Sequence, residues 1–171
     1  TASPFRVRVH DWEASGENPG RARLRASSAD GTSIDFRLST QKPLVLQGEK
    51  GFSQKGFDLA NASFYYSYTR IPTSGTIAVD GNRYRVEGDS WMDHEFSSGI
   101  LQEEQVGWDW FSIQLEDNRE LMLFQLRNKS EEARNYTSGL MVNPDGSSRI
   151  LSMANAEFES VRRWRDKKSG V

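Results

Sequence analysis

The sequence predicts an all-β protein built from antiparallel strands that are joined by hairpins. Apolar and polar residues alternate over segments such as 83–87 and 108–115, and this period of two is typical of half-buried strands. The pairs Asp30-Gly31, Asp80-Gly81 and Asp117-Asn118 stand between such segments, and residues of these types favour tight hairpin turns. Helical patterning is poor, because the one polar stretch of helical composition, residues 102–105, is too short to form a stable helix.

The alternating segments, taken in chain order, give the expected strands. They are residues 21–26, 33–38, 75–79, 83–87, 108–115, 119–127, 137–142, 149–153 and 157–164, and the chain opens on a further strand-like run, TASPFRVRV. Residues 121–126 are apolar on both faces, so we expect this strand to be buried and central rather than peripheral. Long strands with up-and-down hairpins favour a barrel or a calycin-like half-open sandwich.

One long segment, Pro43 to Ala62, interrupts the rhythm of strands. It is punctuated by glycines and has few alternating residues, so we expect a long loop. Its aromatic residues Phe52 and Phe57, with Phe64 just beyond it, imply that the loop folds back onto the protein. A phosphate-binding loop is excluded, because the Gly-Lys-Ser/Thr ending and the following helix are missing.

Composition limits the class of protein. The 171 residues, 36% of them apolar, suffice for one ordinary domain or two small ones. The absence of cysteine excludes disulfides, thiolate catalysis and cysteine-based zinc sites. A formal net charge of -2 provides no bulk attraction for nucleic acid or an anionic membrane, and no apolar run is long enough to span a bilayer. We interpret the basic run at residues 162–168 as a solvated strand end or a severed linker.

The most informative stretch is residues 88–111, GDSWMDHEFSSGILQEEQVGWDWF. Several tryptophans surround the group Asp93-His94-Glu95, in a chain that has only two histidines. Ionisable groups beside indole rings are candidates for desolvation, and such rings commonly line pockets for apolar molecules. We therefore expect Asp93 and His94 at a strand end beside Trp108 or Trp110, with at least one of the two side chains mostly buried. Core tryptophans and a satisfied polar turn are the alternative, because the flanking period-2 patterns predict core aromatics in any case.

Several separated segments carry a family resemblance. They read PLVLQGEKGFSQKG, FYYSYTRIPTSGTIAVDGNRYRVEGDSWMDHEFSS and GWDWFSIQLEDNRELMLFQLR, preceded by Val9-His10-Asp11-Trp12. In this order and spacing, over most of its length, the chain resembles the AttH-like family, which comprises lipocalin-like proteins named as secreted hydrolases and related to carotenoid 1,2-hydratase. The sequence departs from many members at Phe96, where they carry tryptophan after Asp-His-Glu.

The resemblance implies parts of two consecutive lipocalin-like β-domains. Residues 1–100 would be the latter part of the first domain, and residues 101–171 the beginning of the second. Family members start earlier, with a Glu-Trp-Trp-Tyr strand, and continue further, so the chain corresponds to a central piece of the full protein. Because such a piece has open sheet edges, we expect missing segments of the same protein or another copy to complete it. The resemblance also favours a bacterial protein that is periplasmic or secreted.

The resemblance also points to site residues. Asp93 and His94 fall on the motif linked to addition of water across an alkene, with Asp93 as general acid and His94 orienting it or activating the water. Asp109, flanked by two tryptophans, is a second carboxylate candidate for catalysis. The expected ligand-binding residues are Trp91, Trp108, Trp110, Tyr66 and Tyr68. We expect no cofactor and no metal site, since no HExxH pattern is present.

Two functions remain open at this point. The first is a hydrolase or hydratase/isomerase that acts by acid-base chemistry on an apolar small molecule in a cavity at the domain junction. The alternative is a non-catalytic lipocalin-like carrier, or an envelope-associated binding protein, for a lipophilic ligand. In both, the partner is a lipophilic small molecule rather than nucleic acid. Convergence of Asp93, His94 and Asp109 on one pocket favours the enzyme, whereas pairing of these groups with Arg70, Arg83 or Arg127 favours the carrier or a structural role.

Overall fold

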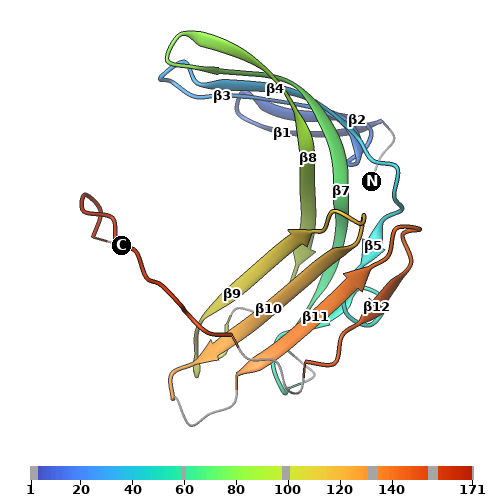
Figure 1. Ribbon diagram of the computed structural model, residues 1–171, viewed down its shortest axis with the longest axis vertical. Helices are drawn as coiled ribbons and strands as arrows, with labels where there is room; N and C mark the ends of the chain where they lie inside the picture. Colours follow the sequence, from blue (N-terminus) through green and yellow to red (C-terminus); the bar gives the residue numbers. More distant parts are fainter. Residues whose placement is uncertain (1–3, 59–60, 98–100, 131–134, 154–157, 171) are drawn as a thin grey trace.

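The computed structural model describes residues 4–58, 61–97, 101–130, 135–153 and 158–170. All regular elements in these ranges are β-strands, and paired strands run antiparallel (Figure 1). The predicted all-β, antiparallel fold is confirmed. Across the same ranges no helix is long and apolar enough to cross a membrane.

The described residues form two sheets. The strands are β1 (Phe5–Val9), β2 (Trp12–Asn18), β3 (Arg21–Ser27), β4 (Ser33–Ser39), β5 (Val45–Leu46), β6 (Phe52–Gln54), β7 (Ala62–Val79), β8 (Asn82–Phe96), β9 (Gln105–Gln114), β10 (Glu120–Asn128), β11 (Tyr136–Val142) and β12 (Ser148–Ile150). The first sheet has the order β1-β2-β3-β4-β7-β5, and β6 and β8 also pair with β7. The second sheet has the order β12-β11-β10-β9.

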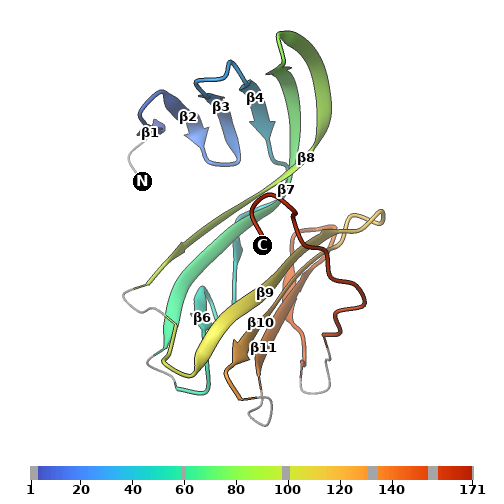
Figure 2. The same ribbon diagram turned by 90° about the vertical axis from the view of Figure 1, so that its left-hand side faces the viewer.

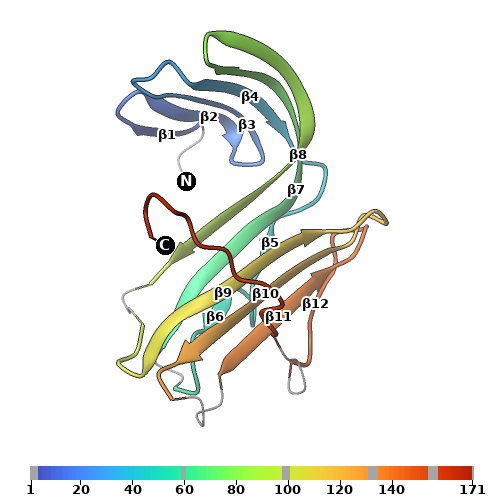
Figure 3. The ribbon, with the colours of Figure 1, turned by 60° about the vertical axis from the view of Figure 1, so that its left-hand side comes forward.

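The long strands β7 and β8 run through two different regions. Their register shifts between Tyr68 and Ile71, so that Thr69 and Arg70 together stand opposite Trp91. A β-bulge of this kind bends a strand and increases its twist. Beyond the bulge the hairpin joins β1–β4 in what we call the curled sheet (β1–β4, residues 72–79 and 82–89). Before it, β5, β6, residues 62–71 and residues 90–96 face β9–β12 in a two-layer arrangement that we call the sandwich (Figures 2 and 3).

The sandwich contains the main apolar core. Tyr65 on β7 packs with Met122, Phe124 and Leu126 on β10, and all four side chains are buried. A smaller cluster joins Val45 with Leu140 and Val142. Strand β10 lies between β9 and β11. The prediction that residues 121–126 form a central strand is therefore confirmed.

A buried ion-pair network joins the two layers at the bulge. The carboxylate of Glu120 on β10 is fully buried and accepts hydrogen bonds from Lys42 Nζ (2.8 Å) and Arg70 Nε (2.7 Å). Thr69 Oγ1 donates to the same carboxylate at 3.1 Å. The bulge directs the adjacent side chains of Thr69 and Arg70 to the same side of the strand, which explains how both reach one group. This network fixes β7 against β10.

The three predicted hairpin turns are confirmed, and they differ in type. Asp80 (φ 50°) and Gly81 (φ 75°) both have positive φ, as a two-residue type I′ turn requires. In the other two turns only the last residue, Gly31 or Asn118, has positive φ. These turns are longer. In each, the main-chain N of the left-handed residue donates to the oxygen three residues earlier, Gly31 to Ser28 at 3.1 Å and Asn118 to Leu115 at 3.2 Å, a geometry found in longer hairpin loops.

Several segments differ from what the sequence predicts. The strand expected at residues 149–153 is shorter, because β12 covers Ser148–Ile150 and residues 151–153 have no regular structure. The expected strand at residues 157–164 is wrong, since residues 158–164 have no regular structure, and residue 157 lies outside the described residues. Phe158 instead stacks on Phe111 with ring centres 5.4 Å apart. The segment 43–62 is not one long loop, because β5 and β6 pair with β7. It does fold back as expected, although Phe52 and Phe57 remain exposed. The division into two domains at residue 100 stays a prediction.

Candidate functional site

Alternation along β7 and β8 gives each strand two faces, and the register shows which side chains share one. Tyr65 lies opposite Glu95, and Ser67 lies opposite Asp93. Tyr65 packs on β10, so this face is directed at the second sheet, and we call it the inner face. Two carboxylates, Asp93 and Glu95, therefore project from one strand toward the space between the layers.

A pocket of about 370 Å³ opens between the inner face and β9–β10. This volume lies in the range of pockets that hold small molecules. Aromatic and aliphatic side chains form much of its wall, and hydroxyl, amide and charged groups complete the lining. The lining residues are Lys55, Asn61, Ser63, Tyr65, Glu95, Ser97, Leu101, Gln105, Trp108, Trp110, Phe124 and Leu126.

The charged group in this pocket is an ion pair between Lys55 and Glu95. Lys55 Nζ contacts Glu95 Oε1, and Ser63 Oγ donates a hydrogen bond to the same oxygen at 2.5 Å. The ammonium also lies over aromatic rings, 4.5 Å from the centre of Phe124 and 5.1 Å from the centre of Tyr65. Aromatic faces attract cations, so Lys55 has a defined position despite its flexible stem.

The loop that supplies Lys55 is fastened from both sides. Gln105 Nε2 and Asn61 Nδ2 each donate to the main-chain oxygen of Lys55, at 2.9 Å and 2.8 Å. Lys55 N donates in turn to the main-chain oxygen of Asn61 at 2.6 Å. These contacts bring a residue of the segment 43–62 to the pocket, where sequence alternation alone does not place it.

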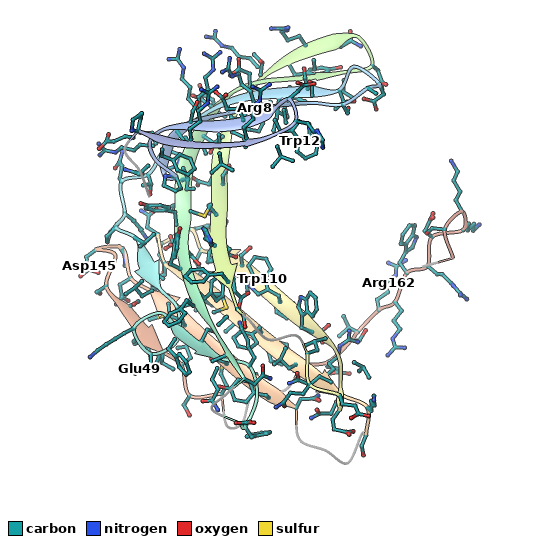
Figure 4. All side chains as sticks on the ribbon, turned by 180° about the vertical axis from the view of Figure 1, so that it is seen from behind. Arg8, Trp12, Glu49, Trp110, Asp145 and Arg162 are labelled. Atoms are coloured by element: carbon teal, nitrogen blue, oxygen red, sulfur yellow. The ribbon has the colours of Figure 1, made fainter. Side chains whose placement is uncertain are left out.

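Tyr65 presents its hydroxyl to the pocket from a buried ring. Trp110 Nε1 donates to Tyr65 Oη at 3.3 Å, and Figure 4 shows Trp110 directed from β9 toward β7 and β8. Burial raises the pKa of Tyr65 well above its ordinary value, and the nearby negative charge of Asp93 raises it further. The phenol therefore keeps its proton near neutral pH, so it serves as a hydrogen-bond donor rather than as a base.

Asp93 is held by neutral donors on the inner face. Ser67 Oγ donates to Asp93 Oδ1, and Trp91 Nε1 donates to the same oxygen at 2.8 Å. Trp91 also meets Trp110 edge to face, with ring centres 6.4 Å apart. Asp93 is nevertheless exposed overall, which contradicts the expectation that Asp93 or His94 is mostly buried, because His94 is exposed as well.

His94 lies on the opposite face of β8 from Asp93. Its Nδ1 is 2.9 Å from Tyr66 Oη, and its ring lies 5.5 Å from that of Phe96. Tyr68 shares this outer face, since Tyr66 and Tyr68 alternate with Tyr65. The structure thus brings His94, Tyr66 and Tyr68 together, but on the far side of the sheet from the pocket.

Asp109 is also separated from Asp93. It pairs across β9 and β10 with Gln125, between Trp108 and Trp110 in sequence, and so points to the other face of its sheet. There its carboxylate lies 3.4 Å from Arg127 Nε. Of the three expected catalytic residues, only Asp93 faces the space beside the pocket. Of the expected ligand-binding residues, Trp108 and Trp110 line the pocket, and Trp91 packs against the core beside it.

Sequence reasoning missed Lys55, Ser63 and Glu95 as members of the site. The spacing of Asp93 and Glu95, two residues apart in a strand, was a usable signal, because such residues share a face. Ser63 lies two residues before Tyr65 and shares its face for the same reason. No comparable signal marked Lys55. Among the described residues no group of acidic and imidazole side chains could hold a metal ion.

The comparisons with known proteins agree with this architecture. The model of the AttH-like family matches residues 1–171. A crystal structure described as a candidate AttH protein from Nitrosomonas europaea has a TM-score of 0.87 and 35% sequence identity, over 96% of this chain and 51% of that one. No curated protein matches the chain significantly.

A second solved structure resembles the chain in fold alone. It is kievitone hydratase from Nectria haematococca, with a TM-score of 0.65 and 14% identity, over 88% of this chain and 46% of that one. The chain therefore spans about half the length of both structures. Together these matches agree with the lipocalin-like fold that the sequence predicts.

Proposed function

Because the chain belongs to the AttH-like family, we propose that it contributes an acid-base site for an apolar small molecule, of the hydratase or hydrolase type. The observation that carries the proposal is the convergence of Glu95, Lys55 and the Tyr65 hydroxyl on one pocket with largely apolar walls, with Asp93 beside them. Polar groups in such surroundings orient a substrate and exchange protons with it.

The two carboxylates have different partners, which suggests different roles. Glu95 is paired with an ammonium, whereas Asp93 has neutral donors beside it, Ser67 and Trp91, and also interacts with the neutral Tyr65 hydroxyl. In hydration of an alkene, Asp93 would give its proton to one carbon. Glu95 would take a proton from the water whose oxygen bonds to the other carbon, and Tyr65 would donate a hydrogen bond to that oxygen. Proton transfer from Glu95 back to Asp93 through solvent would restore both groups.

Turnover and binding can be tested on the same variants. We would incubate the protein with a panel of apolar alkenes small enough for the pocket, and detect by mass spectrometry a product heavier by one water. Asp93→Asn and Glu95→Gln should each reduce turnover by at least about 100-fold, as loss of an acid or base does. Asp109→Asn is the matched control, because its carboxylate faces away from the pocket. Equal losses in all three variants would contradict the proposed site.

A carrier for a lipophilic ligand is the second candidate. It is favoured by the separation of the expected catalytic groups, since Asp109 pairs with Arg127 and His94 faces the far side of the sheet. A carrier would bind the same apolar compounds, with quenching of Trp108 and Trp110 fluorescence, and would leave them unchanged. Binding that survives in Asp93→Asn, without a hydrated product in the wild type, would identify the carrier.

We propose further that the protein works outside the cytoplasm and that its open sheet edges are completed by further chain of the same protein or by another copy. The open apolar face of the curled sheet, with Val7, Val9 and Trp12 more than half exposed, supports a covering layer. Cell fractionation tests the compartment. Light scattering of this chain and of the full-length protein tests the second point, and a monodisperse monomer of the chain with protected β1 amides would contradict it.

A further inference from the structure

Behind Asp93 lies a buried side chain whose hydrogen-bonding capacity is only half used. Gln47, directly after β5, is fully buried, and its main-chain N donates to Tyr65 O at 3.0 Å. Its Nε2 donates to Ser67 Oγ at 2.9 Å, but its Oε1 has no partner among the residues that the structure describes. A buried acceptor without a partner is unfavourable, so the unused end of this amide needs an explanation beyond its hydrogen bond to Ser67.

The turn that follows keeps Gln47 in this place. Gly48 has a φ of +62°, and a Cβ there would lie 2.3 Å from the main-chain oxygen of Phe52. Only glycine meets both conditions. The backbone around Gln47 is therefore fixed, and the freedom that remains is rotation of the terminal amide. Because one end of the amide has no partner, only Ser67 decides which way the amide faces.

The hydrogen bonds run in one direction when Asp93 is ionised. Gln47 Nε2 donates to Ser67, and the Ser67 hydroxyl donates to Asp93 Oδ1. When Asp93 is protonated, the donor and acceptor roles along these hydrogen bonds can reverse. Its O–H donates to Ser67 Oγ, the Ser67 hydrogen turns toward residue 47, and the amide turns over so that Oε1 accepts it. The proton stays on Asp93 and no covalent bond is broken, since only the hydroxyl and the amide rotate.

We propose that Gln47 and Ser67 form a reversible hydrogen-bond relay that supports Asp93 in both its protonated and its ionised state. The relay rests on the proposed acid role of Asp93, which must hold a proton and then lose it in each cycle. It makes Gln47 and Ser67 positioning residues, because neither reaches the pocket. It also explains why a half-used amide occupies a fully buried position.

The other charged groups near Asp93 lie on the neighbouring strands and loops, and each has a partner of its own. Glu95 on β8 and Lys55 before β7 share the inner face, and Tyr65 lies beside it on β7. On β10 the charged group of the inner face is Glu120, which Lys42 and Arg70 neutralise at the bulge. These groups are unchanged in variants of Gln47, so such variants isolate the relay.

The decisive measurement is the titration of the Asp93 carboxyl, followed by its carbon chemical shift in NMR. In Gln47→Leu the ionised state loses the donor to Ser67 Oγ, but Ser67 still donates to the carboxylate. The protonated state instead leaves the buried Ser67 hydroxyl hydrogen without an acceptor, and an unpaired buried donor is tolerated less well than an under-used oxygen. The midpoint of the Asp93 titration should therefore fall, by at most about half to one pH unit, because the hydrogen bonds that the two states lose partly offset each other. If Ser67 only donates to the carboxylate, the midpoint stays in place or rises, and this result would overturn the relay.

Two further variants separate the relay from other effects of the substitution. In a Ser67→Ala background the relay is already broken, so Gln47→Leu should no longer move the midpoint, and a persisting fall would contradict the relay. Gln114→Leu is the matched control, since this inner-face glutamine donates to main-chain oxygens of Thr69 and Ser90 instead. It should lower stability without moving the Asp93 midpoint. If Gln47→Leu does not fold, Gln47→Met gives the same reading with a more adaptable side chain.

The titration does not depend on any substrate. A failed relay therefore leaves the proposed function standing, with Asp93 protonated from its solvent side. Conversely, a confirmed relay without turnover would show a group prepared for proton exchange in a protein that only binds its ligand. When a substrate is known, the alkaline limb of the kcat profile, where the general acid loses its proton, should move in Gln47→Leu in the same direction as the NMR midpoint.

Discussion

The sandwich and the curled sheet share strands β7 and β8, yet they bury their side chains very differently. In the sandwich, Met122, Phe124 and Leu126 are at most 5% exposed. Among the described residues of the curled sheet, Ala22 alone is a buried apolar residue. Val9 and Trp12 are 58% and 54% exposed. The same alternating pattern therefore leads to a packed core where a second layer is present and to an open apolar face where none is described.

The two regions also differ in how they use charge. In the sandwich the carboxylate of Glu120 is fully buried with two cations beside it. In the curled sheet the ion pairs stand in rows on the polar face, as between Arg23 and Asp35. Glu13 lies on the same face, and its pKa is lowered to about 2, mainly by a hydrogen bond from Arg6. Figure 4 shows Arg8 and Trp12 on this sheet, and the register places them on opposite faces.

Removing the buried charge should have the largest effect on stability. Glu120→Gln leaves Lys42 and Arg70 without their shared counter-charge, and breaking a buried pair costs about 3–5 kcal/mol. Asp35→Asn, the matched change in the curled sheet, should cost less than about 1 kcal/mol, because exposed pairs contribute little. Urea unfolding of both variants measures the difference. Similar losses would mean that Glu120 is not the joint between the layers.

The same contrast should hold for apolar side chains. Leu126→Ala opens a cavity in the closed core and should cost about 2–5 kcal/mol. Leu24→Ala removes a half-buried side chain from the open face of the curled sheet, so its cost should be near 1 kcal/mol. Thermal unfolding followed by circular dichroism compares them. A cost for Leu24→Ala as large as that for Leu126→Ala would show that the curled sheet is covered in solution.

Most of the fold could be predicted from the sequence, because its strands alternate and its turns carry the residues that hairpins need. Strand β10 is the clearest case, since its many apolar residues favour a central position, and β9 and β11 do flank it. Its inner face is buried, whereas Leu121 and Leu123 on the other face are only half-buried. The prediction failed for residues 158–164, where Val161 and Trp164 are 89% and 79% exposed and no partner strand is described. Alternation shows that a segment can be a strand, but pairing requires a neighbour.

The site was harder to predict because its aromatic residues occupy both faces of β7. Tyr65 and Tyr66 are adjacent and equally suited to line a pocket, so composition could not decide which face of β7 points inward. The inner face is marked instead by small polar residues, Ser63 and Ser67, which are buried against expectation. Lys55 reaches the pocket through a loop closed by hydrogen bonds, and such contacts follow only from the folded structure.

The buried phenol should make the sandwich sensitive to alkaline pH. The pKa of Tyr65 is raised, so the folded protein keeps this proton after the unfolded chain begins to lose it near pH 10.0. Stability from Tyr65 is thus complete below about pH 10 and falls above it, by up to about 1.4 kcal/mol per pH unit. Tyr65→Phe should remove this part of the alkaline loss, measured as the difference from the wild type. Tyr84→Phe, at an exposed position of the curled sheet, is the control and should leave the loss unchanged.

The smallest expected effect concerns the turn at the tip of the curled sheet. Gly81 has a φ of +75°, and a Cβ there would meet no atom within 4 Å. Any cost of Gly81→Val is therefore conformational, and a β-branched residue in the left-handed region should cost somewhat more than about 1 kcal/mol. Gly88, in the same hairpin, also has open space around it but does not have a positive φ. Gly88→Val should be neutral or slightly stabilising, because valine favours strands. Equal costs for the two variants in urea unfolding would mean that the type I′ turn does not hold this hairpin, and that the curled sheet depends on contacts across its open face instead.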